Sequence, residues 1–242
     1  MIRAVLSALV SSALSLVVVC AAIATPPDAG VTTPSGPPPR CNEQRPQDFL
    51  IRGNYISLAR HTPQERRARQ AVHQRAIRYR TEQYGYFQGF GSPAWNAHPP
   101  TFYAEQITFM GLRVRLHRKI IPAVRCVEQQ LRTQCANEHY APRRLSGIRT
   151  RNTYHTGEIT NHVYGIAIDI DPDRNTCCHC VAKWRDHPLC KRQVQSIFER
   201  MSMPECWVNV FERYGFYWLG HDTLQDTMHF EFLGVPEAIR AP

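Results

Sequence analysis

Nine cysteines constrain this 242-residue chain more than any other feature, because eight of them follow a segment typical of an export signal. Residues 1–24 carry one charge, at Arg3, followed by a largely apolar run with small residues at its end. This pattern predicts a secretory signal peptide cleaved after Ala24, and Cys20 would leave with it. An even number of cysteines in an exported chain favours disulfides, and eight allow roughly a hundred pairings, so the connectivity stays open. The eight are Cys41, Cys126, Cys135, Cys177, Cys178, Cys180, Cys190 and Cys206.

The rest of the chain is long enough for one domain with a sizeable core and an N-terminal extension. After the signal, no stretch reaches the ~18 uninterrupted apolar residues of a membrane helix, so we expect no transmembrane span in the mature chain. The net charge of +9 suits anionic partners such as cell-wall polymers, lipid head groups or nucleic acid, and charge alone does not choose among them.

The first half of the chain is predicted to form a linker, a helix and a covering segment. Residues 25–48 are rich in Pro, Gly, Ser and Thr and are expected to form an extended linker. Thr62 to Glu65 read as a capping box with proline at the first helical position, which predicts a helix to about Gln83. Residues 84–103, aromatic and rich in Gly and Pro, are expected to be a loop or a covering segment. The arginines of this helix form either a basic surface that binds an anionic wall or an ordinary solvated face, and we favour the solvated face. They are Arg66, Arg67, Arg69, Arg75, Arg78 and Arg80.

The second half indicates an α+β fold. Short strands are predicted at residues 145–150, 164–170, 216–219 and 228–232 from their apolar or alternating character. Helices are predicted around residues 194–201 and 207–214, ended by Pro204 and Gly215. An earlier buried helix, tied at its end by Cys126 and Cys135, is predicted from the helical spacing of Leu116, Ile120, Val124, Val127 and Leu131. We therefore expect a small antiparallel sheet flanked by helices in residues 116–242, with residues 49–115 as a helical and aromatic N-terminal extension.

Three segments of this half carry groups that could bind a metal ion and activate water. His162 is followed seven residues later by Asp169, and Asp226 precedes His229 by three. Two histidines and one carboxylate suit catalytic zinc, because a fourth position stays open for water. Arg149 supplies a permanently charged fork suited to a substrate carboxylate or a polarised carbonyl.

These segments resemble the zinc D-alanyl-D-alanine carboxypeptidase and L-alanyl-D-glutamate peptidase family, which shares a wider group with lysostaphin and the hedgehog signalling domain. The family pattern Ser-x-His-x-x-Gly-x-Ala-x-Asp is matched by residues 160–169, and its Asp/Glu-x-x-His by residues 226–229. Ser146 to Arg149 look like the Ser-Gly-Tyr-Arg strand of the family. The resemblance covers roughly residues 120–234.

The resemblance implies a role for each matched position. His162, Asp169 and His229 would bind one Zn²⁺ ion, and Asp226 would act as the general base toward zinc-bound water. Arg149 would hold the substrate and assist catalysis, and Thr160 would contact the substrate. Glu231 is expected to support the site from behind. Thr160 replaces the usual serine, Ile148 the common tyrosine, and Asp226 a glutamate found in many of the carboxypeptidases; aspartate there looks more like the L-alanyl-D-glutamate branch.

Several alternatives remain open at this stage. His155, Asp171, His221 and Asp222 are nearby spare ligands. Residues 169–173 superficially resemble a calcium loop but lack the glycine and the glutamate that an EF-hand needs, so we reject that interpretation. The cysteines of residues 177–190 could bind a second, structural zinc ion, although disulfides are favoured in an exported chain. They are expected to staple an insertion at the rim of the site.

The sequence thus predicts an exported, periplasmic or extracellular zinc metallopeptidase, expected to be a monomer, that cleaves an amide bond in peptidoglycan stem peptides. An anionic cell-wall surface is a possible further partner, and no specific nucleic acid is expected. Carboxypeptidase and endopeptidase activity are both compatible with the motifs. The alternatives are a zinc-containing cell-wall-binding module without turnover and, less favoured, a basic toxin aimed at other cells. The retained Asp226 argues against a pure binding module, which needs no base.

Overall fold

The computed structural model describes residues 41–239 except residues 57–59, 155–156 and 181, and these belong to one compact unit. The predicted signal peptide, most of the predicted linker, Cys20 and His155 lie outside the described residues. Among the described residues, no helix has the length and apolar character that crossing a membrane requires.

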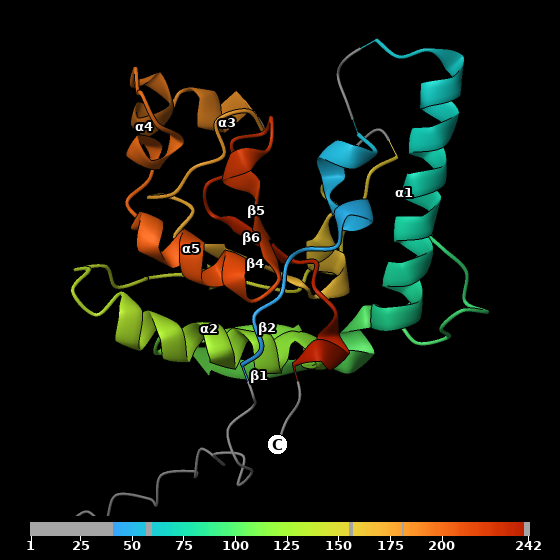
Figure 1. The fold of residues 1–242 in the computed structure, drawn as a ribbon, viewed down its shortest axis with the longest axis horizontal. Coiled ribbons are helices and arrows are strands. Elements are labelled where there is room, and N and C mark those ends of the chain that lie inside the picture. The colour runs from blue at the N-terminus through green and yellow to red at the C-terminus, as the bar shows by residue number, and fades with distance from the viewer. Residues whose placement is uncertain (1–40, 57–59, 155–156, 181, 240–242) are drawn as a thin grey trace, which may run out of the picture. The chain divides into compact units, whose positions relative to one another are not determined.

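A four-stranded antiparallel sheet forms the centre of the second half, which confirms the predicted α+β class (Figure 1). Its order is β3 (Leu145–Ser146), β4 (Ala167–Ile170), β6 (His229–Phe232) and β5 (Phe216–Trp218). Asp169 pairs with His229 across β4 and β6, and with Ser146 across β4 and β3. All residues of β4 and β6 are buried, so the polar side chains at this register lie inside the molecule.

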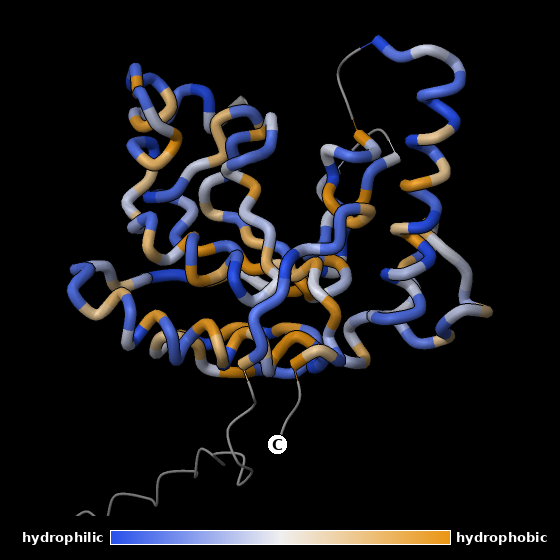
Figure 2. The backbone as a smooth tube through the Cα atoms, viewed as in Figure 1, coloured by the Kyte–Doolittle hydropathy of each residue, from blue (hydrophilic) through white to orange (hydrophobic). Residues whose placement is uncertain are grey.

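Two helices complete the core beside this sheet. Helix α5 (Glu205–Arg213) packs on β5, and the ring of Phe211 stacks on Phe230 of β6 with 4.1 Å between centroids. Helix α2 (Ile121–Gln134) packs on α5, and the Cys135–Cys206 disulfide joins the ends of the two helices. Hydrophobic residues are concentrated along α2 and the strands that it faces (Figure 2). The predicted helix ended by Gly215 and the link at Cys135 are therefore confirmed, whereas Cys126 lies inside α2, not at its end, and pairs with Cys41.

A β-hairpin, which the sequence did not predict, precedes α2. It consists of β1 (Ala104–Phe109) and β2 (Leu112–His117), so Leu116 lies in a strand and the predicted boundary at residues 115/116 falls inside β2. Its two-residue turn, Met110–Gly111, has positive φ at both positions, a geometry that usually uses Asn-Gly, and methionine hides this signal. The hairpin is attached to the second half, because the Ile148 amide donates to the Arg115 carbonyl at 2.9 Å.

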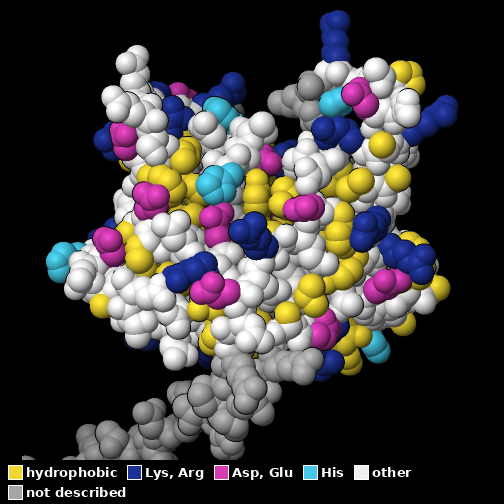
Figure 3. All heavy atoms as spheres, viewed as in Figure 1, with side chains coloured by type: hydrophobic (Ala, Val, Ile, Leu, Met, Phe, Trp, Pro, Cys, Tyr) yellow, Lys and Arg dark blue, Asp and Glu magenta, His cyan; other side chains and the backbone are white. Residues whose placement is uncertain are grey.

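Helix α1 (Pro63–Tyr84) begins with the predicted capping box at Thr62 and Glu65. Most of its arginines are exposed, and basic side chains gather along its outer side (Figure 3). Arg80 is an exception, because it is fully buried rather than part of a basic face. The helix packs against the short 3₁₀ helix η1 (Asp48–Leu50), and residues 85–99 that follow α1 contain no helix and no strand longer than a single bridge.

The predicted helix around residues 194–201 is wrong in length. Only a 3₁₀ helix, η6 (Ile197–Arg200), forms there, because Ser196 caps it at the start and Met201 pairs in extended conformation with Asn175 at the end. The insertion before it holds two one-turn helices, α3 (Ala182–Arg185) and α4 (Pro188–Lys191). The predicted disulfides are confirmed, and they join Cys41–Cys126, Cys135–Cys206, Cys177–Cys180 and Cys178–Cys190.

Candidate metal centre and catalytic cleft

The three predicted metal ligands meet at one buried point. His162 lies in the 3₁₀ helix η5 (Asn161–Tyr164), Asp169 in β4, and His229 at the start of β6. His162 Nε2 lies 3.0 Å from Asp169 Oδ1 and 3.1 Å from His229 Nδ1. The distance between Asp169 Oδ1 and His229 Nδ1 is 2.8 Å. Tetrahedral zinc ligands are separated by about 3.3 Å, given metal–ligand bonds of about 2.0 Å. The three donor atoms therefore have nearly the spacing of a zinc site.

Hydrogen bonds behind the imidazoles decide which ring nitrogens face that point. His162 Nδ1 lies 2.7 Å from the carbonyl oxygen of Gly147, and a carbonyl only accepts, so Nδ1 donates and Nε2 presents its lone pair. His229 Nε2 is 3.1 Å from the Glu231 carboxylate, so Nδ1 presents the lone pair of that ring. With both rings neutral, three lone pairs thus converge on one point, an arrangement that a bound cation satisfies.

Two glycines allow this orientation. A Cβ at Gly147 would lie 2.2 Å from the Arg115 carbonyl oxygen, so only glycine lets this backbone approach β2 and aim its carbonyl at His162. Gly165 ends η5 with φ of 70°, a left-handed conformation that favours glycine. The turn that carries His162 is consequently held on both sides by backbone geometry.

The electrostatics of the cluster favour positive charge. Burial lowers the pKa of His229, but its hydrogen bonds to Asp169 and Glu231 more than offset this and raise it to about 10. Burial raises the pKa of Asp169, yet the two neighbouring imidazoles bring it well below its usual range. Burial alone dominates at His162 and lowers its pKa. The carboxylates that attract a proton to His229 would equally attract a divalent cation.

Glu231 lies behind His229, as expected. It also faces Arg80, a residue that we had expected on the exposed face of its helix. The Glu231 side chain is buried against His229, and the charge of Arg80 helps to lower the pKa of Glu231, although burial opposes this. Arg80 donates to the Leu50 carbonyl at 2.9 Å and to the Tyr55 hydroxyl at 3.3 Å. A signal for its burial existed, because Arg80 follows Ala76 and precedes Tyr84 at steps of four, on the inward face of α1.

Asp226 lies in the turn between β5 and β6 and is buried beside the cluster. Its Oδ1 atom has no hydrogen-bond partner among the described residues. Burial, together with repulsion from Asp169 and Glu231, exceeds the attraction of His229 and raises the pKa of Asp226 to about 7. A carboxylate whose pKa is close to neutrality can both accept and release a proton under physiological conditions.

Arg149 and Thr160 frame the cluster. The Arg149 amide donates to the His162 carbonyl at 3.0 Å, and its guanidinium, about one-third exposed, pairs with Asp169. Thr160 is buried and caps η5 by accepting from the His162 amide at 3.4 Å. Arg149 thus lies between a ligand and solvent, where an incoming anionic group would meet it.

The cluster opens into a cavity of about 810 Å³, which Arg149, Thr160, Asp226 and all three ligands line. One wall comes from the N-terminal region. Arg52, in the 3₁₀ helix η2 (Arg52–Asn54), pairs through Nε with Glu158 at 2.7 Å and through Nη1 with Asp222 at 2.9 Å. No local pattern indicates this role of Arg52, because its partners lie more than 100 residues away along the chain.

The spare ligands have other partners. Asp171 accepts from the Tyr140 hydroxyl at 2.9 Å and from the Arg143 and Arg144 amides, and His221 pairs with Glu212 at 3.0 Å. Cys177, Cys180 and Asp226 form a second group of potential ligands among the described residues, but both sulfurs belong to a disulfide. The structure therefore favours disulfides in this insertion over a second zinc ion.

Comparison with known proteins supports the resemblance to the carboxypeptidase family. Residues 154–232, about a third of the chain, match a family model described as D-alanyl-D-alanine carboxypeptidase. The match confirms the resemblance over the segment that contains His162, Asp169, Asp226 and His229, and it supports a peptidase. Arg149 and the whole N-terminal region lie outside it. Neither the curated proteins nor the solved structures gave a match.

Proposed function

We propose that this chain is an exported zinc peptidase that hydrolyses an amide bond in the peptide stems of peptidoglycan. The observation that carries the proposal is the convergence of three lone-pair donors beside a buried carboxylate, at the base of a cavity and within the matched segment. The donor set of two imidazoles and one carboxylate fits zinc and leaves one position for a substrate or water. His162, Asp169 and His229 would hold the ion.

A bound zinc ion would polarise the scissile carbonyl and lower the pKa of a water molecule to about 7. Asp226 would accept the proton of the attacking water and deliver it to the leaving amine, because its raised pKa suits both transfers. Arg149 would bind the substrate at the mouth of the cluster, where its guanidinium is partly exposed. Burial of the cluster strengthens each of these interactions, since little water competes with them.

Both the terminal D-Ala-D-Ala bond and the L-Ala-D-Glu bond are candidate targets. An aspartate at position 226 favours the second, and Arg52 and Glu158 line the same cavity as the cluster, where they could contact a bound peptide. The four disulfides suit an oxidising compartment outside the cytoplasm. The exposed arginines of α1 would help to retain the protein on an anionic wall.

A binding module without turnover is the second candidate. The burial of Asp226 disfavours it, because burying a carboxylate costs stability, and a module that performs no proton transfer gains nothing in return. Such a module would bind stem peptides and zinc but release no product.

Mass spectrometry of the products separates these possibilities. Mature protein from Thr25 onward would be incubated with defined muropeptides, with and without zinc, beside Asp226→Ala. Loss of one terminal alanine identifies a carboxypeptidase, and release of a peptide that begins with D-Glu identifies an endopeptidase. If zinc is bound and no stem is cleaved, the peptidase proposal is wrong and the binding module stands.

A further inference from the structure

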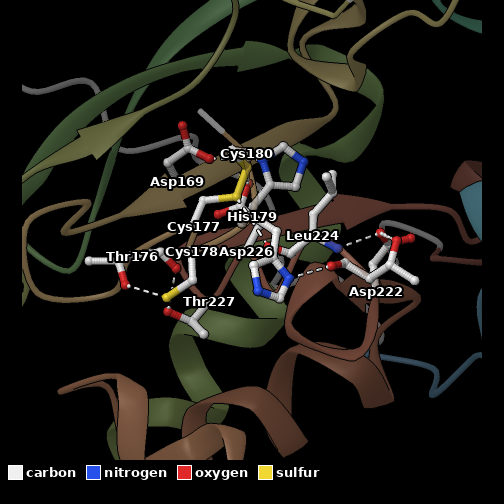
Figure 4. Close-up of a disulfide and its surroundings, with 12 residues drawn as sticks. Asp169, Thr176, Cys177, Cys178, His179, Cys180, Asp222, Leu224, Asp226 and Thr227 are labelled. Atoms are coloured by element: carbon white, nitrogen blue, oxygen red, sulfur yellow. Dashed lines mark hydrogen bonds and ion pairs between the residues drawn. A yellow bond between two sulfur atoms is a disulfide. The ribbon is translucent and has the colours of Figure 1, made fainter. Parts of the chain in front are cut away.

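The Cys177–Cys180 disulfide lies directly against the proposed base, although it belongs to the insertion at the rim. Cys180 Sγ is 3.7 Å from Asp226 Oδ2, and both cysteines line the catalytic cavity (Figure 4). Because Cys180 is oxidised, it has no S–H group to donate, so this contact is packing of sulfur against the carboxylate. Asp226 Oδ1 has no hydrogen-bond partner within the described part of the chain. The side chain is therefore positioned by packing more than by hydrogen bonds.

Backbone contacts hold the cysteine loop and the turn of Asp226 together along their length. Cys177 and Asp226 form an antiparallel bridge. On one side of it, the His179 amide donates to the Leu224 carbonyl at 3.1 Å. On the other side, both the amide and the hydroxyl of Thr227 donate to the Thr176 carbonyl at 3.0 Å. The turn that carries Asp226 is thus paired with residues 176–179 as a short two-stranded clamp.

We propose that the Cys177–Cys180 disulfide is a positioning element for Asp226. The disulfide closes a loop with only two residues between its cysteines, and it fixes the sulfur that packs on the carboxylate as well as the bridge at Cys177. Without it, residues 176–180 lose their closed form, and the turn of Asp226 loses the surface against which it is held. This inference rests on the proposed function only where it concerns turnover; the ordering of the turn is independent of it.

The neighbouring disulfide provides a matched control. Cys178–Cys190 lies in the same insertion and closes a longer loop, with a sequence separation of 12. Its sulfurs contact the Thr176 hydroxyl, at 3.5 Å from Cys178 and 3.2 Å from Cys190, and no contact joins them to Asp226 within the described residues. Its removal should loosen the insertion while it leaves the carboxylate packed.

The test compares Cys177→Ser/Cys180→Ser with Cys178→Ser/Cys190→Ser. We measure kcat and KM on the cleaved muropeptide, zinc content, and hydrogen–deuterium exchange over residues 222–228. The first variant is expected to lower kcat about 100-fold, the loss typical of a catalytic group misplaced by about 1 Å. Its KM and zinc content should stay within about twofold of wild type, since the positioning of a base affects the transition state more than binding. The control keeps the Cys177–Cys180 bond and its contact with Asp226, so its kcat should stay at least about tenfold above that of the first variant.

Each outcome decides a different point. Unchanged kcat and unchanged exchange in Cys177→Ser/Cys180→Ser overturn the inference and leave the proposed function intact. A wild-type protein that cleaves no stem overturns the proposed function, and exchange then judges the inference alone. Faster exchange of residues 222–228 in the first variant but not in the control supports the clamp, and equal exchange in both contradicts it.

A second variant covers the case in which Cys177→Ser/Cys180→Ser does not fold. Thr227→Val removes the hydroxyl bond to Thr176 and leaves every disulfide in place. It should lower kcat about tenfold with KM unchanged, because the clamp is weakened from the other side. Wild-type kcat together with wild-type exchange in this variant would refute the clamp.

Discussion

The proposed metal cluster and the N-terminal region differ in which elements their contacts join. Asp169 and His229 are direct neighbours across β4 and β6, and His162 lies seven residues before Asp169. Arg52, Arg80 and Cys41 of the N-terminal region instead meet partners in distant parts of the chain. Two neighbouring strands and the short helix η5 before β4 thus arrange the proposed ligands, whereas their surroundings are assembled from the whole molecule. A short family match can therefore include the proposed ligands and still leave out supporting groups such as Arg52 and Arg80.

The largest expected effect comes from breaking the cluster itself. His162→Ala removes one of the three donors and leaves only Asp169 and His229 to hold the ion. We expect zinc affinity to fall more than about 1,000-fold and cleavage to disappear. Isothermal titration calorimetry with zinc measures the first effect, and His139→Ala, outside the cluster, serves as control. Retention of wild-type affinity would show that the ion lies elsewhere.

Replacing the proposed base should separate chemistry from metal binding. Asp226→Asn keeps the size of the side chain and removes its proton acceptor. We expect kcat to fall about 10²–10⁴-fold with the zinc content unchanged. Asp226 must be ionised to accept a proton, so wild-type kcat/KM should fall as the pH drops through its raised pKa, and the variant should lack this limb. A variant with full kcat would assign the base to another residue.

The contribution of the N-terminal region to the metal site can be measured through Arg80. Arg80→Met removes the buried charge that acts on Glu231, the carboxylate behind His229. We expect zinc affinity to fall about tenfold, within the range for groups that orient metal ligands, and Arg80→Lys to restore part of it. Arg78→Met, exposed on the same helix, is the control. Equal zinc affinities for Arg80→Met, Arg80→Lys and Arg78→Met would show that the N-terminal region covers the site without contributing to metal binding.

The smallest effect on the site is expected from the disulfide that ties the N-terminal region down. Cys41 and Cys126 are 85 residues apart, so loss of their bond should lower the free energy of unfolding by about 4 kcal/mol through the entropy of the unfolded chain. Zinc affinity of the folded protein should stay within about twofold of wild type, since this bond joins residue 41 to α2 and not to the elements that carry the cluster. Chemical denaturation and calorimetry measure the two quantities. A large loss of affinity would mean that this bond also shapes the site.

The predictable part of the molecule was the part with local signals. The capping box at Thr62, the buried strand that ends at Ile170 and the ligand pairs could be recognised because each is specified within a few residues. The β1–β2 hairpin was missed because Met110 occupies a turn position that usually signals itself by asparagine. The helix predicted around Ile197 is short because Met201 pairs with Asn175, and no local pattern encodes that contact.

Among the supporting groups, Glu231 was predicted, whereas Arg80 has only a weak local signal and the Cys177–Cys180 contact has none. Arg80 was grouped with the exposed arginines of α1, because only its position relative to Ala76 and Tyr84 distinguishes it from Arg78. The pairing of Cys177 with Cys180, and its contact with Asp226, depend on how the turn before β6 returns past the insertion. Such contacts are set by the tertiary fold, whereas the ligand motif can be read in the sequence alone.

The central claim is that His162, Asp169 and His229 bind one zinc ion, and anomalous diffraction tests it most directly. Crystals of the zinc-loaded mature protein would be measured above and below the zinc absorption edge. The account predicts a single anomalous peak within about 2.1 Å of His162 Nε2, His229 Nδ1 and an Asp169 carboxylate oxygen. A peak at any other set of side chains, or none in a protein that retains stoichiometric zinc in solution, would contradict it.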